Sequence, residues 1–342
     1  MIDLREKIKS IIDREKAKNH FSVLDDSSIE FIQQIFNNYE DTNNLRQDME
    51  NIPKQAELIF VAAPTGAGKD SLVIKLNKKN PEKKYIELNI DIFRHYFAKF
   101  IPDVSELKDK TFAFQTNEFA YEIYFTIQEI LITEFPGTNI IITGTLRETD
   151  WVEETFRLFK SVNNLTEYYI KLIALAVPKK ESAYSVIKRY VKIVDSQINK
   201  DDFVPGTARY TSLDYHDETF ERFPNNLQYF QNSFLKCPGQ LIDAMEVYKR
   251  SSSIDDYEED TLVYSSEREK YKDTDALTEV LRLRTMPVIY SDLDVLDLLN
   301  KVKMHCEYMT DQGIFGDLVS DLGGLLGYKQ LVDRKEKDTL LK

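Results

Sequence analysis

The segment from Glu57 to Ser71 constrains the fold more than any other part of the chain. An apolar strand pattern ends in a turn with two glycines and a lysine, and a helical pattern follows at once. In such a turn, backbone N–H groups and a helix N-terminus surround a phosphate, and the lysine adds a point charge. The order predicts a phosphate-binding P-loop made of Pro64, Thr65, Gly66, Ala67, Gly68, Lys69, Asp70 and Ser71.

Two positions depart from the usual P-loop pattern. Ala63 stands in place of the first glycine, and Asp70 stands where a serine or threonine usually holds magnesium. Asp70 could ligate Mg²⁺ directly, oxygen to hard cation, or Ser71 could contribute from the next position. A carboxylate also repels phosphates, so Asp70 could equally weaken nucleotide binding. Both interpretations remain open at this point.

Composition narrows the class of protein. The chain has 342 residues, of which 42% are hydrophobic and 30% charged, as in a globular protein. It lacks an apolar run of about 18 residues, and its charged N-terminus lacks a signal-peptide core, so we expect a cytoplasmic protein without a membrane span. The net charge of −13 disfavours nucleic-acid and anionic-membrane partners but not a small phosphorylated ligand. Cys237 and Cys306, the only cysteines, lack metal-ligand spacing and are interpreted as idle thiols.

The pattern along the chain predicts an α/β fold. Residues 1–52 have helical spacing of apolar residues, and strands alternate with helices afterwards. Several strand candidates are unbroken apolar runs, which is typical of strands covered on both faces. We therefore predict a P-loop kinase fold, with a mostly parallel sheet flanked by helices and helical extensions at both ends. The expected strands are residues 58–62, 85–90, 139–143, 168–177 and 246–249.

The remaining segments complete the predicted organisation. Residues 251–275 are polar and acidic, so we expect a solvated loop or linker there, and helical spacing resumes from Ala276. The glycines between Gly323 and Gly327 indicate a break between helices. The predicted units are an N-terminal helical segment (1–55), a P-loop kinase core (56–266) and a C-terminal helical extension (267–342).

Polar residues follow the second and third predicted strands. In an open α/β sheet, the carboxyl ends of the strands line the ligand crevice. Asp91, shortly before Arg94, is therefore placed to act as a base towards a substrate hydroxyl, or else it caps the following helix. After the third strand, Thr143, Gly144 and Thr145 offer a close backbone approach and hydroxyls. Arg147 could reach a phosphate or lie on the surface.

Two arginines follow the fourth strand. Arg189 lies in a helical pattern and Arg209 further on, in a short segment with Gly206. As a pair they are typical of lid arginines that neutralise charge between phosphate donor and acceptor. Taken singly, each could be an ordinary solvated or salt-bridged charge.

Between about residues 57 and 264 the chain resembles the zeta toxin family, the kinase half of epsilon/zeta-type toxin–antitoxin systems. The resemblance depends on seven short motifs in the same order, each weak alone. They are Gly66 to Lys69, Asp91 to Arg94, Gly144 to Asp150, Ala176 to Lys179, Arg189-Tyr190, Thr207 to Arg209, and His216-Asp217 followed by Pro224 to Leu227.

The resemblance implies an ATP-dependent kinase that phosphorylates a sugar hydroxyl of a nucleotide sugar, UDP-N-acetylglucosamine, with Mg²⁺. It implies that Lys69 binds the β- and γ-phosphates and that Asp91 is the catalytic base. Arg189 and Arg209 match phosphate-binding, transfer-stabilising arginines. Arg94, Thr143, Thr145 and Arg147 fall on the substrate side.

Departures from the family pattern leave alternatives for the activity. Thr143 replaces a glutamate that helps to hold the sugar, and Asn89 replaces the first aspartate of an Asp-x-Asp pair. The acceptor could therefore be another nucleotide, such as NAD. The chain could also be a degenerate, non-catalytic nucleotide-binding regulator. A nucleic-acid end as acceptor is disfavoured by the acidic charge.

The resemblance also implies a protein partner, an antitoxin. Antitoxins of this family are small helical proteins that block the nucleotide site, and some family members carry such a block in their own chain. Residues 1–52 could thus be a cis-acting inhibitor, or could simply pack against the sheet. We favour packing.

Overall fold

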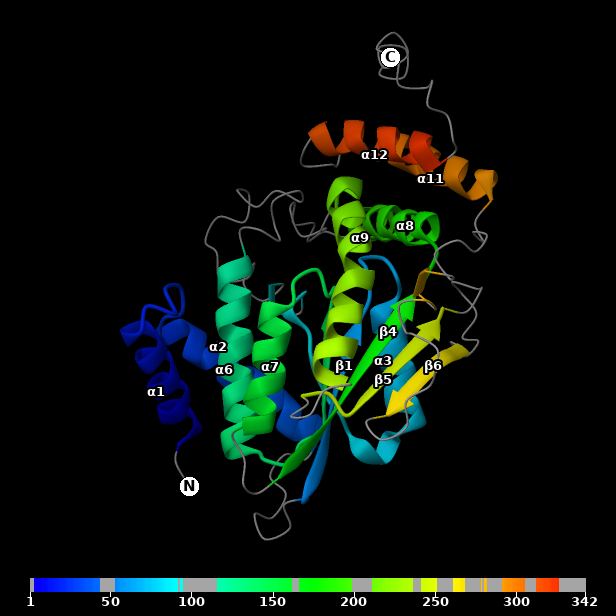
Figure 1. Cartoon of the computed structure of the whole chain (residues 1–342). Helices are drawn as coiled ribbons and strands as arrows, with labels where there is room; N and C mark the ends of the chain where they lie inside the picture. Colours follow the sequence, from blue (N-terminus) through cyan, green and yellow to red (C-terminus); the bar gives the residue numbers. More distant parts are fainter. Residues whose placement is uncertain are drawn as a thin grey trace.

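A six-stranded sheet forms the centre of the molecule (Figure 1). The computed structural model describes residues 3–43, 53–91, 93–94, 116–161, 166–198, 211–235, 241–250, 261–267, 278, 280–281, 291–304 and 312–325. The strand order is β2-β3-β1-β4-β5-β6, in which the first five strands are parallel and β6 is antiparallel to β5. The predicted mostly parallel α/β fold is confirmed. The strands are β1 (Gln55–Ala62), β2 (Ile86–Leu88), β3 (Ile140–Gly144), β4 (Glu167–Ala176), β5 (Ala244–Lys249) and β6 (Thr261–Glu267).

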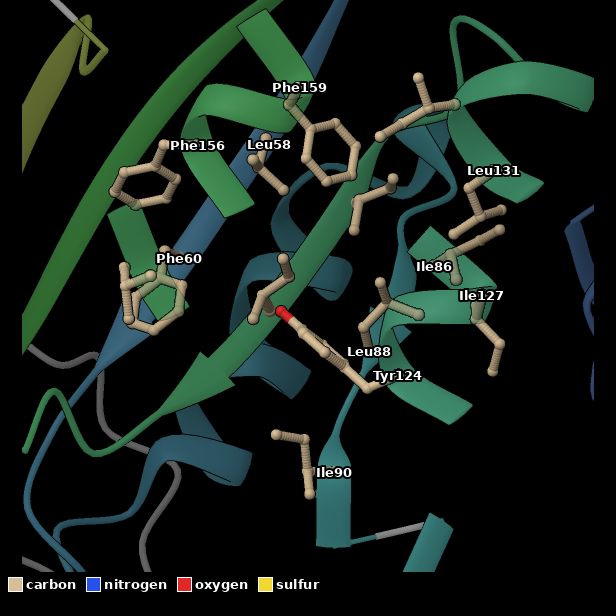
Figure 2. Close-up of a cluster of buried hydrophobic side chains, with 14 of the residues drawn as sticks. Leu58, Phe60, Ile86, Leu88, Ile90, Tyr124, Ile127, Leu131, Phe156 and Phe159 are labelled. Atoms are coloured by element: carbon tan, nitrogen blue, oxygen red, sulfur yellow. The ribbon is translucent and has the colours of Figure 1, made fainter. Parts of the chain in front are cut away.

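Helices cover both faces of this sheet, as parallel strands require. Side chains of β1 alternate between the faces. Leu58 and Phe60 belong to the cluster that includes α6 (Asn117–Glu134) and α7 (Asp150–Ser161), part of which Figure 2 shows. Ile59 and Val61 pack in a second cluster with α3 (Lys69–Lys79). Unbroken apolar strands are therefore consistent with burial on both sides.

The N-terminal helices are continuous with the main core. Ile8 and Ile11 of α1 (Leu4–Ala17) and Ile32 of α2 (Asp26–Asn43) are buried in the same cluster as the strands. The buried carboxylate of Glu122 on α6 accepts hydrogen bonds of 2.6–3.2 Å from the backbone N–H groups of residues 22–24, between α1 and α2. These contacts support the packing interpretation, as far as residue 43.

Two long helices follow the fourth strand of the chain. α8 (Lys179–Ile198) and α9 (Leu213–Phe230) follow β4, and the short elements η2 (Pro81–Lys83) and η4 (Gln231–Leu235) complete the core. The C-terminal helices α11 (Asp292–Met304) and α12 (Gln312–Leu325) lie across α8 (Figure 1). Val295, Leu298 and Leu318 pack there against Ile187 and Tyr190 of α8.

Two sequence expectations were wrong in part. Residues 261–267, expected within a solvated linker, form β6, since an edge strand exposed on one side needs no continuous apolar run. Gly323 and Gly324, expected at the start of a break that runs to Gly327, lie in the last turn of α12, which ends at Leu325, and the rest of the expected break lies outside the described residues. Burial of Leu318 and Leu322 stabilises that helix, and tertiary packing outweighs the low helix propensity of glycine.

Cys237, Cys306 and residues 44–52 of the predicted helical segment lie outside the described residues. None of the helices in the described part of the chain has the length and apolar character needed to cross a bilayer.

Candidate functional site

The predicted P-loop joins the end of β1 to the start of α3. Gly66 and Gly68 have φ angles of 82° and 96°, in the left-handed region that favours glycine, and Gly68 caps the N-terminus of α3. A Cβ on Gly66 would lie 2.3 Å from the Ser182 carbonyl oxygen of α8. Both conformation and close approach therefore require glycine at residue 66.

Ala63 explains how the loop manages without its first usual glycine. Its side chain is buried in the cluster with α3, and its N–H donates to the Gly144 carbonyl oxygen at 3.1 Å. The residue thus extends the pairing of β1 with β3, where alanine is as acceptable as glycine. Lys69 reaches back over the loop and donates to the carbonyl oxygens of Ala63 and Pro64, at 3.0 and 3.4 Å.

A cavity of about 480 Å³ opens beside this loop, at the carboxyl ends of the strands. It brings together most of the residues singled out in the sequence, although they come from separate segments. Those on its wall are Thr65, Gly66, Gly68, Lys69, Asp70, Ser71, Asp91, Arg94, Thr143, Thr145, Arg147 and Arg189. Pro64 and Ala67 are buried behind the loop instead. Arg209 lies outside the described residues.

Asp91 is held at the cavity by neighbours on its own helical turn. The Asn89 side chain accepts a hydrogen bond of 3.0 Å from the Asp91 N–H, so Asn89 rather than Asp91 caps this turn. The Asp91 carboxylate lies 3.2 Å from the Arg94 guanidinium and is half exposed. Arg94 is buried and also donates to Asn117 at the start of α6, at 2.8 Å. The capping interpretation of Asp91 is therefore not needed.

Asp70 and Ser71 place side-chain oxygens beside the cavity at the N-terminus of α3. Burial raises the pKa of the nearby Glu87, and the negative charge of Asp70 raises it further. The described residues include no cluster of three His, Cys, Asp or Glu side chains suited to a metal. Mg²⁺ commonly uses one or two protein oxygens together with phosphates and waters, which fits Asp70 and Ser71.

One face of α8 supplies cations that the sequence analysis only partly identified. Ser185, Lys188, Arg189 and Lys192 all line the cavity, at the spacing i, i+3, i+4 and i+7 of one helical face. Only Arg189 was singled out from the sequence. Extending its helical face by one turn towards the C-terminus would have found Lys192, whereas Lys188 directly precedes Arg189.

Arg250, directly after β5, was also missed. Its guanidinium donates to the Gly66 carbonyl oxygen at 3.3 Å and to the Ser185 hydroxyl at 3.4 Å. It lies 3.8 Å from the buried carboxylate of Glu181, whose pKa is raised by burial against the opposing effect of Arg250. The strand-end rule used for the second and third strands would have found Arg250 at the end of the fifth.

The wall opposite the loop combines hydroxyls, an arginine and aromatic rings. The Arg147 guanidinium lies 4.8 Å from the centre of the Tyr215 ring, in cation–π geometry. Asn226 donates to the carbonyl oxygens of Leu146 and Arg147, at 2.9 and 2.8 Å, and fixes the turn. Tyr121 and Trp151, which the sequence analysis did not single out, line the same region.

Comparison with known proteins gives the family and the fold. The model of the zeta toxin family matches residues 42–262, well over half of the chain. No protein with a curated description matches the sequence.

Solved structures similar to this chain include three that cover most of it. One comes from the PezAT chromosomal toxin–antitoxin system of Streptococcus pneumoniae, with 18% identity and a TM-score of 0.55, covering 82% of this chain and 96% of the other. Two AvrRxo1-ORF1:AvrRxo1-ORF2 structures, with sulphate ions and with ATP, are 14% and 13% identical at a TM-score of 0.50. Each covers 89% of this chain and 90% of the other. At these identities the likeness concerns the fold.

Proposed function

The chain belongs to the zeta toxin family, and from that premise we propose that it is an ATP-dependent kinase and the toxin of a toxin–antitoxin system. The observation that carries the proposal is a single cavity with a phosphate loop on one side and a carboxylate, Asp91, on another. A kinase needs these two groups close together, because the donor phosphate must meet an activated hydroxyl.

The donor half consists of the loop and α8. The N–H groups at the start of α3 and the Lys69 ammonium would bind the β- and γ-phosphates of ATP. Asp70 and Ser71 would hold Mg²⁺, which when bound neutralises phosphate charge. Lys188 and Arg189 would offset the charge that spreads over the transferred phosphoryl group. Arg209 keeps the same proposed role.

Asp91 acts on the acceptor. The acceptor hydroxyl would donate its proton to the Asp91 carboxylate as its oxygen bonds to the γ-phosphorus, and ADP leaves with the electron pair of the broken P–O bond. The contact with Arg94 orients the carboxylate and favours its ionised form, in which it can accept the proton.

We assign the acceptor to the wall with Arg94, Thr143, Thr145 and Arg147. Hydroxyls and arginines suit a nucleotide sugar such as UDP-N-acetylglucosamine, whose diphosphate needs cations. Tyr121 and Trp151 offer faces for a base. NAD or another nucleotide remains the alternative acceptor. Structures of this fold include a toxin–antitoxin system and an ATP complex, which supports ATP and a helical antitoxin as partners.

The remaining parts of the proposal concern organisation. We keep the units 1–55, 56–266 and 267–342 and a cytoplasmic location, where ATP is abundant. No described residue of α1 or α2 lines the cavity, which favours a packing role over inhibition in cis. The second candidate, a non-catalytic nucleotide-binding regulator, is favoured by Asp70 alone.

The test is phosphate transfer by purified protein with ATP and Mg²⁺, followed by mass spectrometry across nucleotide sugars, NAD and nucleosides. Asp91→Asn is expected to lower transfer by about 100-fold or more while ATP binding persists. Trp151, the only tryptophan, lines the cavity and reports binding by fluorescence. Asp26→Asn, in the first turn of remote α2, is the matched control.

Equal transfer by Asp91→Asn and the unaltered protein would contradict the role of Asp91. Binding of ATP without transfer to any acceptor would favour the regulator.

A further inference from the structure

A chain of polar contacts runs from the surface to the phosphate loop through a buried histidine. Lys179 Nζ lies 2.8 Å from Asp217 Oδ2, and Asp217 Oδ1 lies 3.0 Å from His216 Nδ1. His216 Nε2 lies 3.0 Å from Ser182 Oγ, which donates to the Thr65 carbonyl oxygen at 2.6 Å. The chain therefore joins α8, α9 and the loop.

The inner part of this chain is closed to solvent. Ser182 and His216 both have 0% exposure, and the His216 ring stacks against Phe220. The outer part is not closed: Asp217 and Lys179 are partly exposed. Hydrogen bonds in the inner part thus depend on the protons that its own members carry.

Counting protons gives the state of His216. A serine hydroxyl has one proton, and when Ser182 gives it to Thr65 only lone pairs remain for Nε2, which must then be protonated. The Asp217 carboxylate, ionised beside Lys179, accepts only, so Nδ1 must be protonated too. All three bonds form together only when His216 is the charged imidazolium.

Neutral imidazole has one proton and must give up one of these bonds. The charged Asp217 keeps that proton on Nδ1, because a lone pair facing a carboxylate at 3.0 Å is repulsive. Nε2 then becomes an acceptor, and the Ser182 hydroxyl turns towards it and away from Thr65.

We propose that His216 is a positioning residue for the phosphate loop: its charge decides whether the Ser182 hydroxyl holds the Thr65 carbonyl or turns to the imidazole. The carbonyl of Thr65 and the N–H of Gly66 belong to one trans peptide and point in opposite directions. Holding the carbonyl against α8 therefore directs the Gly66 N–H away from α8, on the side where a donor phosphate would bind.

Among the described residues, the charged groups near His216 are Asp217 on α9 and Lys179 on α8, and Lys179 also lies 3.8 Å from Glu221. The loop contributes the neutral Thr65 carbonyl. Burial lowers the pKa of His216, Asp217 raises it, and Lys179 lowers it again. The imidazolium therefore forms on the acid side of the ordinary histidine range. At that lower pH the Ser182 hydroxyl bonds the Thr65 carbonyl and holds the loop against α8.

The first experiment needs no nucleotide. In the unliganded full chain, NMR of ¹⁵N-histidine should report a neutral His216 with its proton on Nδ1, and the Gly66 amide resonance should shift with the titration of His216. In Ser182→Ala, which removes one oxygen, the Gly66 amide resonance should no longer shift with the titration of His216. His20, exposed and bonded to Glu15 at 2.9 Å, is the internal control, and its titration should leave Gly66 unmoved.

A neutral His216 with its proton on Nε2 would overturn the proposal. The proposal would also be overturned if the Gly66 amide resonance did not shift with the titration of His216, or if it shifted by the same amount in Ser182→Ala.

The second experiment is based on the proposed function, since it measures ATP–Mg²⁺ binding by Trp151 fluorescence from about pH 4.5 to 8.5, a range that extends to the acid side of the ordinary histidine pKa. His216→Gln places a donor near Ser182 that does not titrate, so it serves as reference at each pH. Relative to this variant, the unaltered protein should lose affinity roughly three- to tenfold as the pH rises through the pKa of His216. Ser182→Ala should show no such loss.

The same pH dependence in all three proteins would overturn the proposal. Absence of ATP binding at every pH would instead contradict the proposed function. The NMR titration, which needs no nucleotide, would then test the role of His216 by itself.

Discussion

Asp70 lies in the first turn of α3 with an exposed carboxylate at the cavity. Without metal, its charge repels a triphosphate, so Asp70→Asn should strengthen ATP binding by about fivefold in EDTA. With Mg²⁺ the sign should reverse, because the variant loses a charged ligand. Calorimetric titrations with and without the metal check both signs. Stronger binding under both conditions would mean that Asp70 only repels.

Arg250 compensates a buried carboxylate. Arg250→Met should destabilise the fold by about 1–3 kcal/mol, because it removes the nearer of two cations, Arg250 and Lys249, that offset the buried carboxyl of Glu181. Burial already raises the pKa of Glu181 in the folded state. A carboxyl with a raised folded pKa binds more protons when folded, so its stability contribution falls as the pH rises.

Compared with the unaltered protein, Arg250→Met should therefore show a loss of unfolding free energy in urea that grows as the pH rises above the raised pKa of Glu181. The double variant Glu181→Gln/Arg250→Met should remove that growth. A deficit independent of pH would indicate that only packing was lost.

Individual residues differ in how well the sequence identified them. Lys69 was singled out from the glycine and lysine pattern of the loop, and Asp91 and Arg147 from the rule about strand ends. Lys188, Lys192 and Arg250 are ordinary surface-type cations in the sequence. The helical face of Arg189 and the end of the fifth predicted strand point to Lys192 and Arg250, but only the packing of α8 and β5 beside the loop shows that these cations border the cavity.

At the scale of the elements, replacing glycine by alanine should have opposite effects on stability in the loop and in α12. Gly66→Ala should cost at least about 1–2 kcal/mol from its positive φ alone, and the close Ser182 carbonyl oxygen should add to this. Gly323 lies in a helix with open space around its Cα, so Gly323→Ala should stabilise by about 0.5–1 kcal/mol. Thermal unfolding of both variants measures the difference. A tolerated Gly66→Ala would contradict the described loop conformation.

The elements also show where sequence patterns were sufficient. The first four parallel strands have long or dense apolar runs, and their predicted bounds are close to those observed, except that β1 begins three residues earlier and β2 is shorter. β6 was missed because half of its residues are polar and its partner, β5, is brought beside it only in the folded chain.

At the scale of the whole molecule, α11 and α12 affect the cavity indirectly, because they pack against α8. One side of α8 packs on these helices, and another presents Lys188 and Arg189 to the cavity. Leu318→Ala should cost about 2–5 kcal/mol, since the side chain is fully buried, and should also weaken ATP binding by loosening α8. Leu293→Ala, 75% exposed on α11, should change stability by less than about 0.5 kcal/mol.

Chemical unfolding and Trp151 fluorescence measure the two effects. Full ATP affinity in a destabilised Leu318→Ala would show that the C-terminal helices stabilise the fold without positioning α8.

The sequence by itself determined the glycine–lysine loop and the mostly parallel sheet, because both depend on neighbours along the chain. Local order of strand, glycines, lysine and helix is enough to specify a loop, and apolar runs are enough to specify buried strands. The tertiary structure alone decided which cations meet in the cavity and that His216 reaches the loop through Ser182. Those contacts join residues 34 to 184 positions apart, and only packing brings them within hydrogen-bond distance.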